Sequence, residues 1–376
     1  MRIIGANVFD VQNGFVRRDL CTDGELISYR SGDDTVVEAD GCWLIPGLTD
    51  LHFHGCRGED FSDGSPEGLA VMADYELSRG VTQICPAGMT LDREALLAMC
   101  ANARRHRETA KGGADLVGIN LEGPFLSPEK KGAQNGAWLR NPDTALFREL
   151  QNEAKGLVKL VSVAPELPGA LDFIQQVGGR VCVSIAHTAA DYETALAAFQ
   201  AGARQVTHLY NAMPPFAHRA PGVVGAAFDT TPESRVELIC DGVHVHPSVV
   251  RATFRMFGPD RVILISDTMR AAGMPDGDYT LGGQDVHVEG RRATLADGTL
   301  AGSATDLMAC MVTAVQMGIP LHHAVKAAAV NPARAIGIYS RVGSLEPGKR
   351  ANLVLLDRDL QVREVIFRGR TVEPVR

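Results

Sequence analysis

The sequence predicts an α/β fold: a (β/α)8 barrel of the TIM type with a small β-sandwich domain formed from both chain ends. Two observations support this prediction. Between residues 44 and 265, eight short runs rich in β-branched residues alternate with connections long enough for a crossover. Both ends of the chain instead hold short β-type segments, and at the N-terminal end these are separated by turn signals such as Asp23-Gly24 and Asp40-Gly41.

The 376 residues suffice for one large and one small domain. We expect residues 1–46 and 343–376 to pair into the small β-sandwich domain and residues 47–342 to form the barrel. The predicted barrel strands are Leu44–Leu51, Val81–Cys85, Leu116–Leu121, Leu157–Val163, Val181–Ile185, Gln205–Thr207, Val236–Ile239 and Val262–Ile265. Helical spacing predicts helices at Pro66–Ser78, Arg93–Arg107, Tyr192–Ala201, Pro247–Phe257, Asp306–Met317 and Leu321–Ala335.

The composition argues against several classes of protein. Hydrophobic residues make up 45% and charged residues 22% of the chain, as in soluble globular proteins. The net charge of −8 argues against nucleic-acid and acidic-membrane partners, and no uncharged apolar span reaches the ~18 residues of a membrane helix. The eight cysteines have no Cys-x-x-Cys spacing, and several lie in apolar runs. We therefore expect reduced thiols and a cytoplasmic protein.

Side chains that can bind metals or transfer protons follow the ends of six predicted strands. His52 and His54 alternate about Phe53 at the end of the first strand, so both imidazoles would lie on one face. The others are Glu122 after the third strand, His187 after the fifth, His208 after the sixth, Asp241 and His244 after the seventh, and Asp267 after the eighth. Because barrel active sites lie at the carboxyl ends of the strands, we expect these side chains to meet at one rim.

Each of these residues also has an ordinary structural interpretation. Glu122 could be an exposed carboxylate before a turn, and His187 a polar residue near a helix start. His208 could be a hydrogen-bonded core histidine, and Asp267 the cap of the following segment. Four such accidents would have to converge on one rim, so we favour a metal centre. Histidine and carboxylate ligands suit a divalent transition ion, zinc first, with iron or manganese as alternatives. If six ligands are present, two ions that share Glu122 are geometrically sensible.

Eight segments of the chain resemble a known family. They are P-G-L-T-D-L-H-F-H-G at 46–55, N-L-E-G-P-F-L-S-P-E-K-K-G-A-Q at 120–134, A-H-T-A-A-D at 186–191, T-H-L-Y-N-A-M-P-P-F-A-H-R-A-P-G at 207–222, C-D-G-V-H at 240–244, S-D-T-M-R-A-A-G at 266–273, G-T-L-A-G-S at 298–303 and P-G-K-R-A-N-L-V-L-L-D at 347–357. On these segments the chain resembles the amidohydrolase superfamily, and within it the deacetylases that act on N-acetylglucosamine 6-phosphate. The His-x-His pair is typical of the whole superfamily, whereas the second and fourth segments are far narrower.

This resemblance implies a role for each residue at the rim. Glu122, His187 and His208 would hold the principal metal ion, and His52 and His54 would hold a second ion in those members that bind two. Asp267 would be the catalytic acid/base and a further metal ligand, and His244 would lie near the substrate carbonyl. The residues expected to contact the sugar phosphate are Ala133, Gln134, Asn211, Ala212, Arg219, His244, Leu300, Ala301 and Gly302. Arg219 would reach in from the second subunit of a homodimer.

The implied reaction is metal-dependent hydrolysis of the acetamide of N-acetylglucosamine 6-phosphate, which yields glucosamine 6-phosphate and acetate. Three alternatives stay open. The sugar could be N-acetylgalactosamine 6-phosphate, which differs in the orientation of one hydroxyl. The protein could be another amidohydrolase, although Lys159 lies mid-strand and not at the strand end where cyclic-amide members carry a lysine. It could also be an inactive scaffold with the same barrel, which the complete set of ligand positions argues against.

Overall fold

The computed structural model of the chain, which describes residues 1–230 and 234–372, contains a closed barrel of parallel strands. Its strands are β8 (Leu48–Asp50), β11 (Val81–Ile84), β12 (Ala87–Gly88), β13 (Asp115–Leu116), β14 (Ile119–Leu121), β15 (Val158–Val163), β16 (Cys182–Ile185), β17 (Gln205–Val206), β18 (Arg235–Ile239) and β19 (Val262–Ile265). Strands β11 and β12 together occupy the second barrel position, and β13 and β14 the third. All eight predicted barrel positions are therefore confirmed, but the first predicted strand, Leu44–Leu51, is divided: its first residues belong to β7 (Trp43–Pro46), outside the barrel, and only β8 lies in the ring.

The ring closes between the first and the last barrel strand. Just beyond the ends of β8 and β19, the Asp267 N–H donates to the His52 carbonyl at 2.9 Å and the His54 N–H donates to the Thr268 carbonyl at 2.7 Å. We call this junction the seam. It places the first predicted pair of histidines beside Asp267, which comes from the opposite end of the barrel segment.

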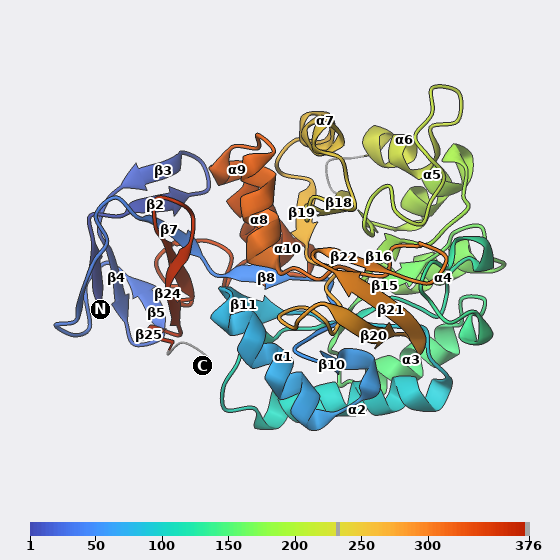
Figure 1. Cartoon of the computed structure of the whole chain (residues 1–376), viewed down its shortest axis with the longest axis horizontal. Coiled ribbons are helices and arrows are strands. Elements are labelled where there is room, and N and C mark those ends of the chain that lie inside the picture. The colour runs from blue at the N-terminus through green and yellow to red at the C-terminus, as the bar shows by residue number, and fades with distance from the viewer. Residues whose placement is uncertain (231–233, 373–376) are drawn as a thin grey trace.

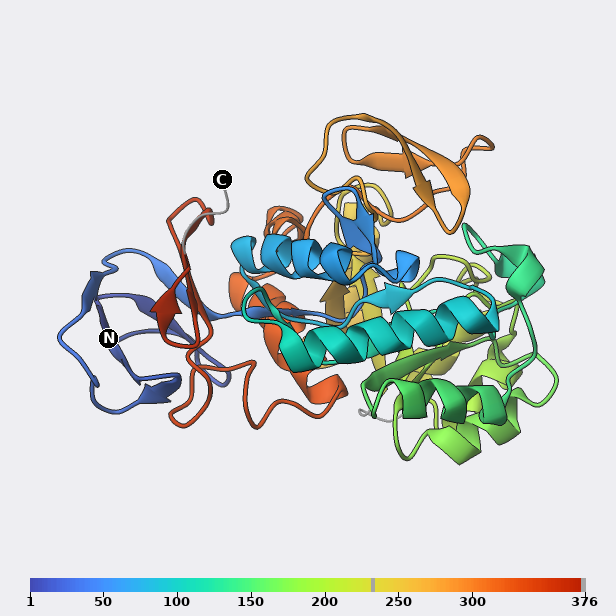
Figure 2. The same ribbon diagram turned by 90° about the horizontal axis from the view of Figure 1, so that it is seen from below.

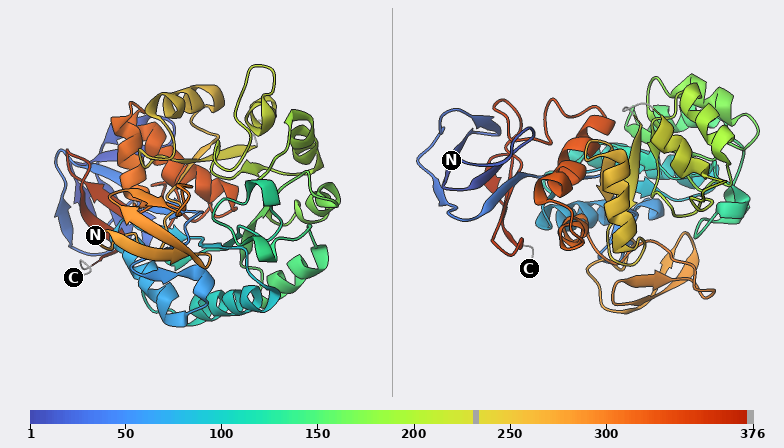
Figure 3. Two further views of the ribbon diagram at one scale, coloured as in Figure 1. Left: turned by 45° about the vertical axis from the view of Figure 1, so that its right-hand side comes forward. Right: turned by 90° about the horizontal axis from the view of Figure 1, so that it is seen from above.

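Helices surround the strands (Figure 3, left). They are α1 (Pro66–Ser78), α2 (Arg93–Thr109), α3 (Thr144–Glu153), α4 (Ala170–Val177), α5 (Tyr192–Ala201), α6 (Gly222–Asp229), α7 (Pro247–Phe257), α8 (Leu307–Gln316), α9 (Leu321–Val325) and α10 (Asn331–Ala335). Three of them, α1, α5 and α7, have the predicted bounds. Capping side chains explain where two of these helices begin. Ser65 caps α1 ahead of Pro66, and Asp191 caps α5.

The predicted helix at 321–335 is divided into three parts. A π-helical turn, Lys326–Val330, separates α9 from α10. Short 3-10 turns at Phe61–Asp63, Pro128–Lys130 and Gly136–Trp138 complete the helical segments. Among the described residues, we find no helix that is both long and apolar enough to span a bilayer.

Both chain ends build the sheets at one side of the molecule (Figure 1). One sheet has the order β25-β24-β23-β7-β2-β3 and the other β5-β4-β1-β6. Their strands are β1 (Arg2–Ile4), β2 (Asn7–Asp10), β3 (Gly14–Arg17), β4 (Leu20–Asp23), β5 (Leu26–Ser28), β6 (Val36–Glu38), β7 (Trp43–Pro46), β23 (Leu353–Leu356), β24 (Val362–Phe367) and β25 (Arg370–Thr371). Because β7 pairs with β2 and with β23, the two ends share one sheet, and the predicted fold class is confirmed.

Beside these two mixed sheets, a third sheet, which is antiparallel throughout, was not predicted from the sequence. It consists of β20 (Gly277–Leu281), β21 (Gln284–Glu289) and β22 (Arg292–Thr294) and stands away from the ring of helices (Figure 2). The turn Gly282-Gly283 joins its first two strands, and both glycines have positive φ values of 58° and 78°. A smaller hairpin pairs β9 (Gly55–Cys56) with β10 (Glu59–Asp60) directly after the His-x-His pair.

An apolar cluster lies in the barrel interior among buried polar side chains. Leu51, Cys85, Leu160, Ile239, Ile263 and Ile265 form one cluster there, and none of them is more than 1% exposed. The residues that the sequence predicted to meet follow the carboxyl ends of the strands, at the rim of this interior.

Candidate metal centre

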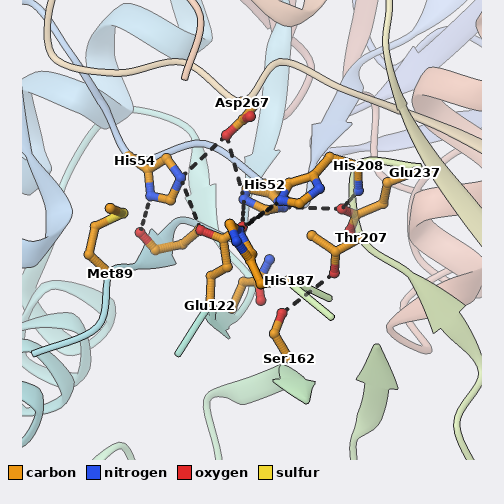
Figure 4. A network of polar contacts seen from close by, with 12 residues as sticks. His52, His54, Met89, Glu122, Ser162, His187, Thr207, His208, Glu237 and Asp267 are labelled. Carbon is orange, nitrogen blue, oxygen red and sulfur yellow. Dashed lines mark hydrogen bonds and ion pairs between the residues drawn. The ribbon is translucent and has the colours of Figure 1, made fainter. Parts of the chain in front are cut away.

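A cavity of about 370 Å³ opens at the carboxyl ends of the barrel strands. Its floor holds five of the predicted ligands: His54, Glu122, His187, His208 and Asp267. His52, the sixth, lies directly behind them and has no exposed surface. The sequence prediction that these residues meet at one rim is therefore confirmed, and they meet in two groups (Figure 4).

The first group consists of Glu122, His187 and His208. Glu122 follows β14 directly, and each histidine lies two residues beyond the end of its strand, β16 or β17. The Glu122 Oε1 atom lies 3.3 Å from His187 Nε2 and 3.0 Å from His208 Nε2. The two Nε2 atoms are 3.1 Å apart. We call this group the principal half of the centre.

The second group consists of His52, His54 and Asp267, at the seam of the barrel, and we call it the seam half. The Asp267 Oδ1 atom lies 3.6 Å from His52 Nε2 and 3.3 Å from His54 Nε2. Glu122 belongs to both halves, because its Oε1 atom lies 3.2 Å from His52 Nε2 and its Oε2 atom 3.3 Å from His54 Nε2.

These residues fit divalent metal ions. Ligand atoms on a tetrahedral ion with bonds of ~2.0–2.1 Å lie about 3.3 Å from one another, and the distances in the principal half are 3.0–3.3 Å. In addition, His52 Nε2 is buried and has no hydrogen-bond partner within the described residues. Buried polar atoms in folded proteins normally have a partner, so the lone pair of His52 is available for a ligand.

Three of the four imidazoles are oriented by a hydrogen bond at Nδ1, the ring nitrogen that faces away from the centre. The His54 Nδ1–H donates to the Ala87 carbonyl at 3.1 Å, and the His187 Nδ1–H donates to the Lys130 carbonyl at 2.8 Å. The His52 Nδ1 atom instead faces the Glu237 carboxyl group at 3.1 Å. Because carbonyl and carboxylate oxygens accept, each ring keeps its proton on Nδ1, and a metal ion that replaces the proton on Nε2 would meet the Nε2 lone pair.

The backbone is strained at three of these residues. His187, His208 and Asp267 have positive φ values of 42°, 28° and 51°, a region that side chains other than glycine rarely adopt. Such strain persists only where the surrounding structure enforces it, and it collects at functional sites. In this barrel it turns the side chains at the strand ends inward over the cavity floor.

The electrostatics of the centre keep both carboxyl groups ionised. Burial raises the pKa of Glu122, but the charge of His52 and the hydrogen bonds from His187 and His208 outweigh burial and hold that pKa well below its usual range. Burial acts on Asp267 in the same direction, and the hydrogen bond from His54 with the nearby imidazoles lowers its pKa below the ordinary value. Both carboxylates are thus prepared to bind a cation.

His244 lies at the cavity wall and is held by Asp241. The Asp241 Oδ2 atom accepts from His244 Nδ1 at 2.7 Å, and its Oδ1 atom accepts from the backbone N–H groups of Val243 and His244. Burial alone would lower the pKa of His244, but the hydrogen bond and the charge of Asp241 raise it above its ordinary value. The Nε2 side of the ring is left for a ligand.

The structure brings together most of the residues expected to contact substrate. Seven of them line the cavity: Ala133, Gln134, Asn211, Ala212, His244, Leu300 and Gly302. Gln134 also donates to Glu122 Oε2 at 2.8 Å, so it holds the carboxylate that both halves share. Ala301, also expected to contact substrate, is fully buried against residues of the third, antiparallel sheet and does not line the cavity.

Arg219 is exposed and does not line the cavity of its own chain. Cys56, which follows the His-x-His pair by two residues, is fully buried and its thiol faces the Met72 carbonyl at 4.0 Å. Lys159 is the second residue of β15, packs against Gly118 and does not line the cavity, which is not where cyclic-amide members carry their lysine.

Sequence reasoning missed two features of the site. Glu237 lies inside β18, where the run V-E-L-I looks like an ordinary strand, and only the alternation of side chains in the barrel turns it inward. Leu281, at the end of β20, lines the cavity from the unpredicted sheet. The hairpin signal Gly282-Gly283 beside it was the available clue.

Comparisons with known proteins agree with this geometry. A model of the amidohydrolase family matches residues 43–372. The chain belongs to the amidohydrolase family. This amidohydrolase is 39% identical to the N-acetylglucosamine-6-phosphate deacetylase of Bacillus subtilis (strain 168), over 87% of this chain and 83% of that protein. It is 35% identical to the N-acetylgalactosamine-6-phosphate deacetylase of Escherichia coli O157:H7, over 92% of each chain.

Solved structures give the same result for the whole fold. The N-acetyl-D-glucosamine-6-phosphate deacetylase of Mycobacterium smegmatis superposes with a TM-score of 0.91 at 34% identity, over 99% of this chain and 100% of that chain. An Asp-to-Ala mutant of the same enzyme was solved in complex with N-acetyl-D-glucosamine 6-phosphate, and it also superposes with a TM-score of 0.91. The amidohydrolase family is metal-dependent, and the two ligand groups found in this chain fit that dependence.

Proposed function

We propose that this amidohydrolase removes the acetyl group of N-acetylglucosamine 6-phosphate by metal-dependent hydrolysis, with glucosamine 6-phosphate and acetate as products. One observation carries the proposal: the two ligand groups lie at the floor of a cavity that seven of the nine expected substrate contacts line. Its volume of about 370 Å³ lies in the ~300–1,000 Å³ range of small-molecule sites. The named activity of the relatives supports the same substrate.

Zinc is the ion that we propose first, because it favours four-coordinate sites of histidine and carboxylate, and iron or manganese are the alternatives. Glu122, His187 and His208 would hold one ion, and His52, His54 and Asp267 a second. When bound, such an ion supplies a Lewis acid for the acetamide carbonyl and lowers the pKa of a water molecule to about 7.

Two side chains of the cavity would move protons and stabilise charge. Asp267 is ionised before reaction, so its carboxylate accepts the proton of the attacking water and then delivers it to the departing amine. His244 uses Nδ1 to bind Asp241 and directs Nε2 at the carbonyl oxygen, where negative charge develops. One preorganised donor of this kind is typically worth about 3–4 kcal/mol in the transition state.

The sugar phosphate needs a cation at the mouth of the cavity, and we propose that Arg219 of a second subunit supplies it. The guanidinium fork matches phosphate oxygens, and Arg219 is exposed in a loop that also leaves Phe216 53% exposed. The protein would then be a homodimer with shared sites.

Mixed dimers test the shared site. Arg219→Ala and Asp267→Asn variants, each inactive or nearly so alone, are unfolded together and refolded. If Arg219 acts across the interface, half of the dimers regain one intact site, and about one quarter of wild-type activity returns. No gain on mixing would show that Arg219 acts within its own chain or not at all.

The substrate is tested by acetate release from three sugars offered to the metal-loaded protein: N-acetylglucosamine 6-phosphate, N-acetylgalactosamine 6-phosphate and unphosphorylated N-acetylglucosamine. We expect rapid release from the first. Faster release from the second would assign the galacto sugar, which the similarity to the E. coli enzyme keeps as the second candidate. Equal release from the unphosphorylated sugar would refute the phosphate site, and no release from any would reject the substrate class.

Two further proposals concern the whole protein. We divide the chain into a small β-sandwich domain, 1–46 with 343–376, and a barrel, 47–342, because β7 ends at Pro46 and β8 begins at Leu48. Residues 373–376 lie outside the described residues. We also propose a cytoplasmic location, which the eight free thiols support, since disulfides are rare in that compartment.

A further inference from the structure

Glu237 is a buried carboxyl group that the proposed reaction does not use. It lies in the middle of β18 and has no exposed surface. It shares a strand face with Ile239, which belongs to the barrel interior, so its side chain points inward. Burying a carboxyl group is costly unless it is paired, and a position inside the barrel beside the metal centre therefore calls for an explanation.

Among the described residues, three hydrogen-bond donors reach the Glu237 carboxyl group. Gln205 Nε2 donates to Oε1 at 2.6 Å, while the Nδ1 atom of His52 and the backbone N–H of His208 reach Oε2 at 3.1 and 3.3 Å. The side chain thus serves as the acceptor in all three contacts. It touches one ligand from each half of the metal centre (Figure 4).

His52 differs from its neighbours in the partner on Nδ1. His54 and His187 donate to neutral main-chain carbonyl groups, whereas His52 donates to a carboxylate. A charged acceptor raises the basicity of the opposite ring nitrogen more than a neutral one. In His52 that nitrogen, Nε2, is the buried atom without a hydrogen-bond partner.

We propose that Glu237 is the positioning residue that allows the seam half to bind its own metal ion. Two divalent ions beside Glu122 and Asp267 leave excess positive charge in a buried site. A third carboxylate, one imidazole away, reduces the repulsion between the ions. Its contact with His208 also holds the end of β17 beside the end of β8. The inference rests on the metal centre proposed above, and it is independent of the identity of the sugar.

The test is a metal titration of Glu237→Gln. Glutamine keeps the size of the side chain and an oxygen that accepts from His52, so the variant removes the charge together with the acceptor for Gln205. Metal-free wild type and variant are titrated with Co²⁺ against a chromophoric chelator. We expect the wild type to bind two ions, and the variant to bind the first with wild-type affinity and the second about 10–100-fold more weakly.

Two controls separate positioning from general support of the barrel. In a His52→Asn background, Glu237→Gln should cause no further loss of Co²⁺ binding, because the link to the seam half is already broken. The urea midpoint of the metal-free protein measures how much Glu237 contributes to the stability of the fold. A purely structural role would make Glu237→Gln lower this midpoint equally in the wild-type and His52→Asn backgrounds. If Glu237→Gln fails to fold, Glu237→Asp keeps the charge but shortens the reach, and it too should weaken only the second ion.

Three results would overturn the proposal: a wild type that binds one ion, a second ion bound equally by wild type and variant, or equal weakening of both ions. The titration needs no sugar. If acetate were released from none of the sugars while the second ion still depended on Glu237, the substrate would be rejected and the role of Glu237 would stand.

Discussion

The two halves of the metal centre are built in different ways. The principal half takes its ligands from the ends of β14, β16 and β17, which lie within one stretch of the parallel sheet. The seam half joins His52 and His54 to Asp267, from opposite ends of the barrel segment. The principal half follows from pairing between strands that are close in sequence, whereas the seam half exists only once the ring has closed.

Buried side chains reinforce the half that depends on closure. Asp50 accepts from the His52 N–H at 3.0 Å and from the Ser266 hydroxyl at 2.5 Å, so it ties both sides of the seam together. The Ser303 hydroxyl donates to the Ser266 carbonyl at 2.6 Å. Together with Glu237, these contacts surround the seam half with polar partners that lie outside the cavity. Metal ligands that come from distant parts of the chain are thus held in place by additional buried hydrogen bonds.

The largest expected effect comes from Glu122→Gln, which removes the charge that both halves share. We expect the variant to bind neither ion tightly, and its acetate release to fall below that of every other variant described. The purified protein is measured by inductively coupled plasma mass spectrometry and by circular dichroism. A folded variant that retains one full equivalent of metal would show that the halves are independent.

Asp267→Asn removes one ligand of the seam half and the proposed acid/base. General acid–base catalysis typically contributes 10²–10⁴-fold, and we expect acetate release to fall by about that factor. The principal half keeps all three ligands, so about one ion per chain should remain. Full activity in this variant would remove Asp267 from the mechanism.

A pair of serine variants compares the two halves directly. Ser266→Ala leaves a buried oxygen of Asp50 unpaired, and we expect the free energy of unfolding to fall by about 1–3 kcal/mol and the second ion to bind more weakly. The matched control is Ser184→Ala, which breaks the 2.6 Å contact with Thr207 below the principal half. Ser184→Ala should lower the free energy of unfolding by about 0.5–1.5 kcal/mol and leave Co²⁺ binding unchanged. Equal effects on the second ion would contradict the difference drawn between the halves.

The smallest expected effect is a shift in the titration of His244. Asp241 raises the pKa of His244 against the effect of burial, so the pair stabilises the fold fully between about pH 4, where Asp241 is ionised, and about pH 6.5, and this contribution is lost as the pH rises through the raised value. In Asp241→Asn, nuclear magnetic resonance should show His244 losing its proton at lower pH. The difference in urea midpoint between wild type and variant should be larger at pH 6 than at pH 9. A difference that grows with pH would assign Asp241 another role.

Much of the fold and of the site could be predicted from the sequence because both follow local rules. The β-branched runs identified all eight barrel positions, and helical spacing gave the bounds of α1, α5 and α7. The ligands were found because each follows a strand end, the position at which barrel side chains converge. Asn211, Ala212 and Gln134 were identified through family resemblance and not through spacing.

The remaining features depend on contacts that a sequence does not display. Glu237 has the surroundings of any strand residue, and its importance appears only when β8 closes against β19 and brings His52 beside it. Ala301 lies in the segment that resembles the family, yet it is buried against the third, antiparallel sheet. The proposed place of Arg219 involves a second copy of the chain, which no pattern within one chain can test.

Strand β7 connects the chain ends to the metal centre in a way that concerns protein synthesis. It pairs with β2 on one side and β23 on the other, and it continues through Gly47 into β8 and the two histidines of the seam. β7 ends at Pro46 and β23 begins at Leu353, so at ~5–20 residues per second a ribosome needs about 15–60 s to make the stretch between them. All three ligands of the principal half leave the ribosome within this interval, while one edge of β7 is still unpaired. The ligands of the principal half are therefore all synthesised before the sheet that anchors the seam histidines can be completed.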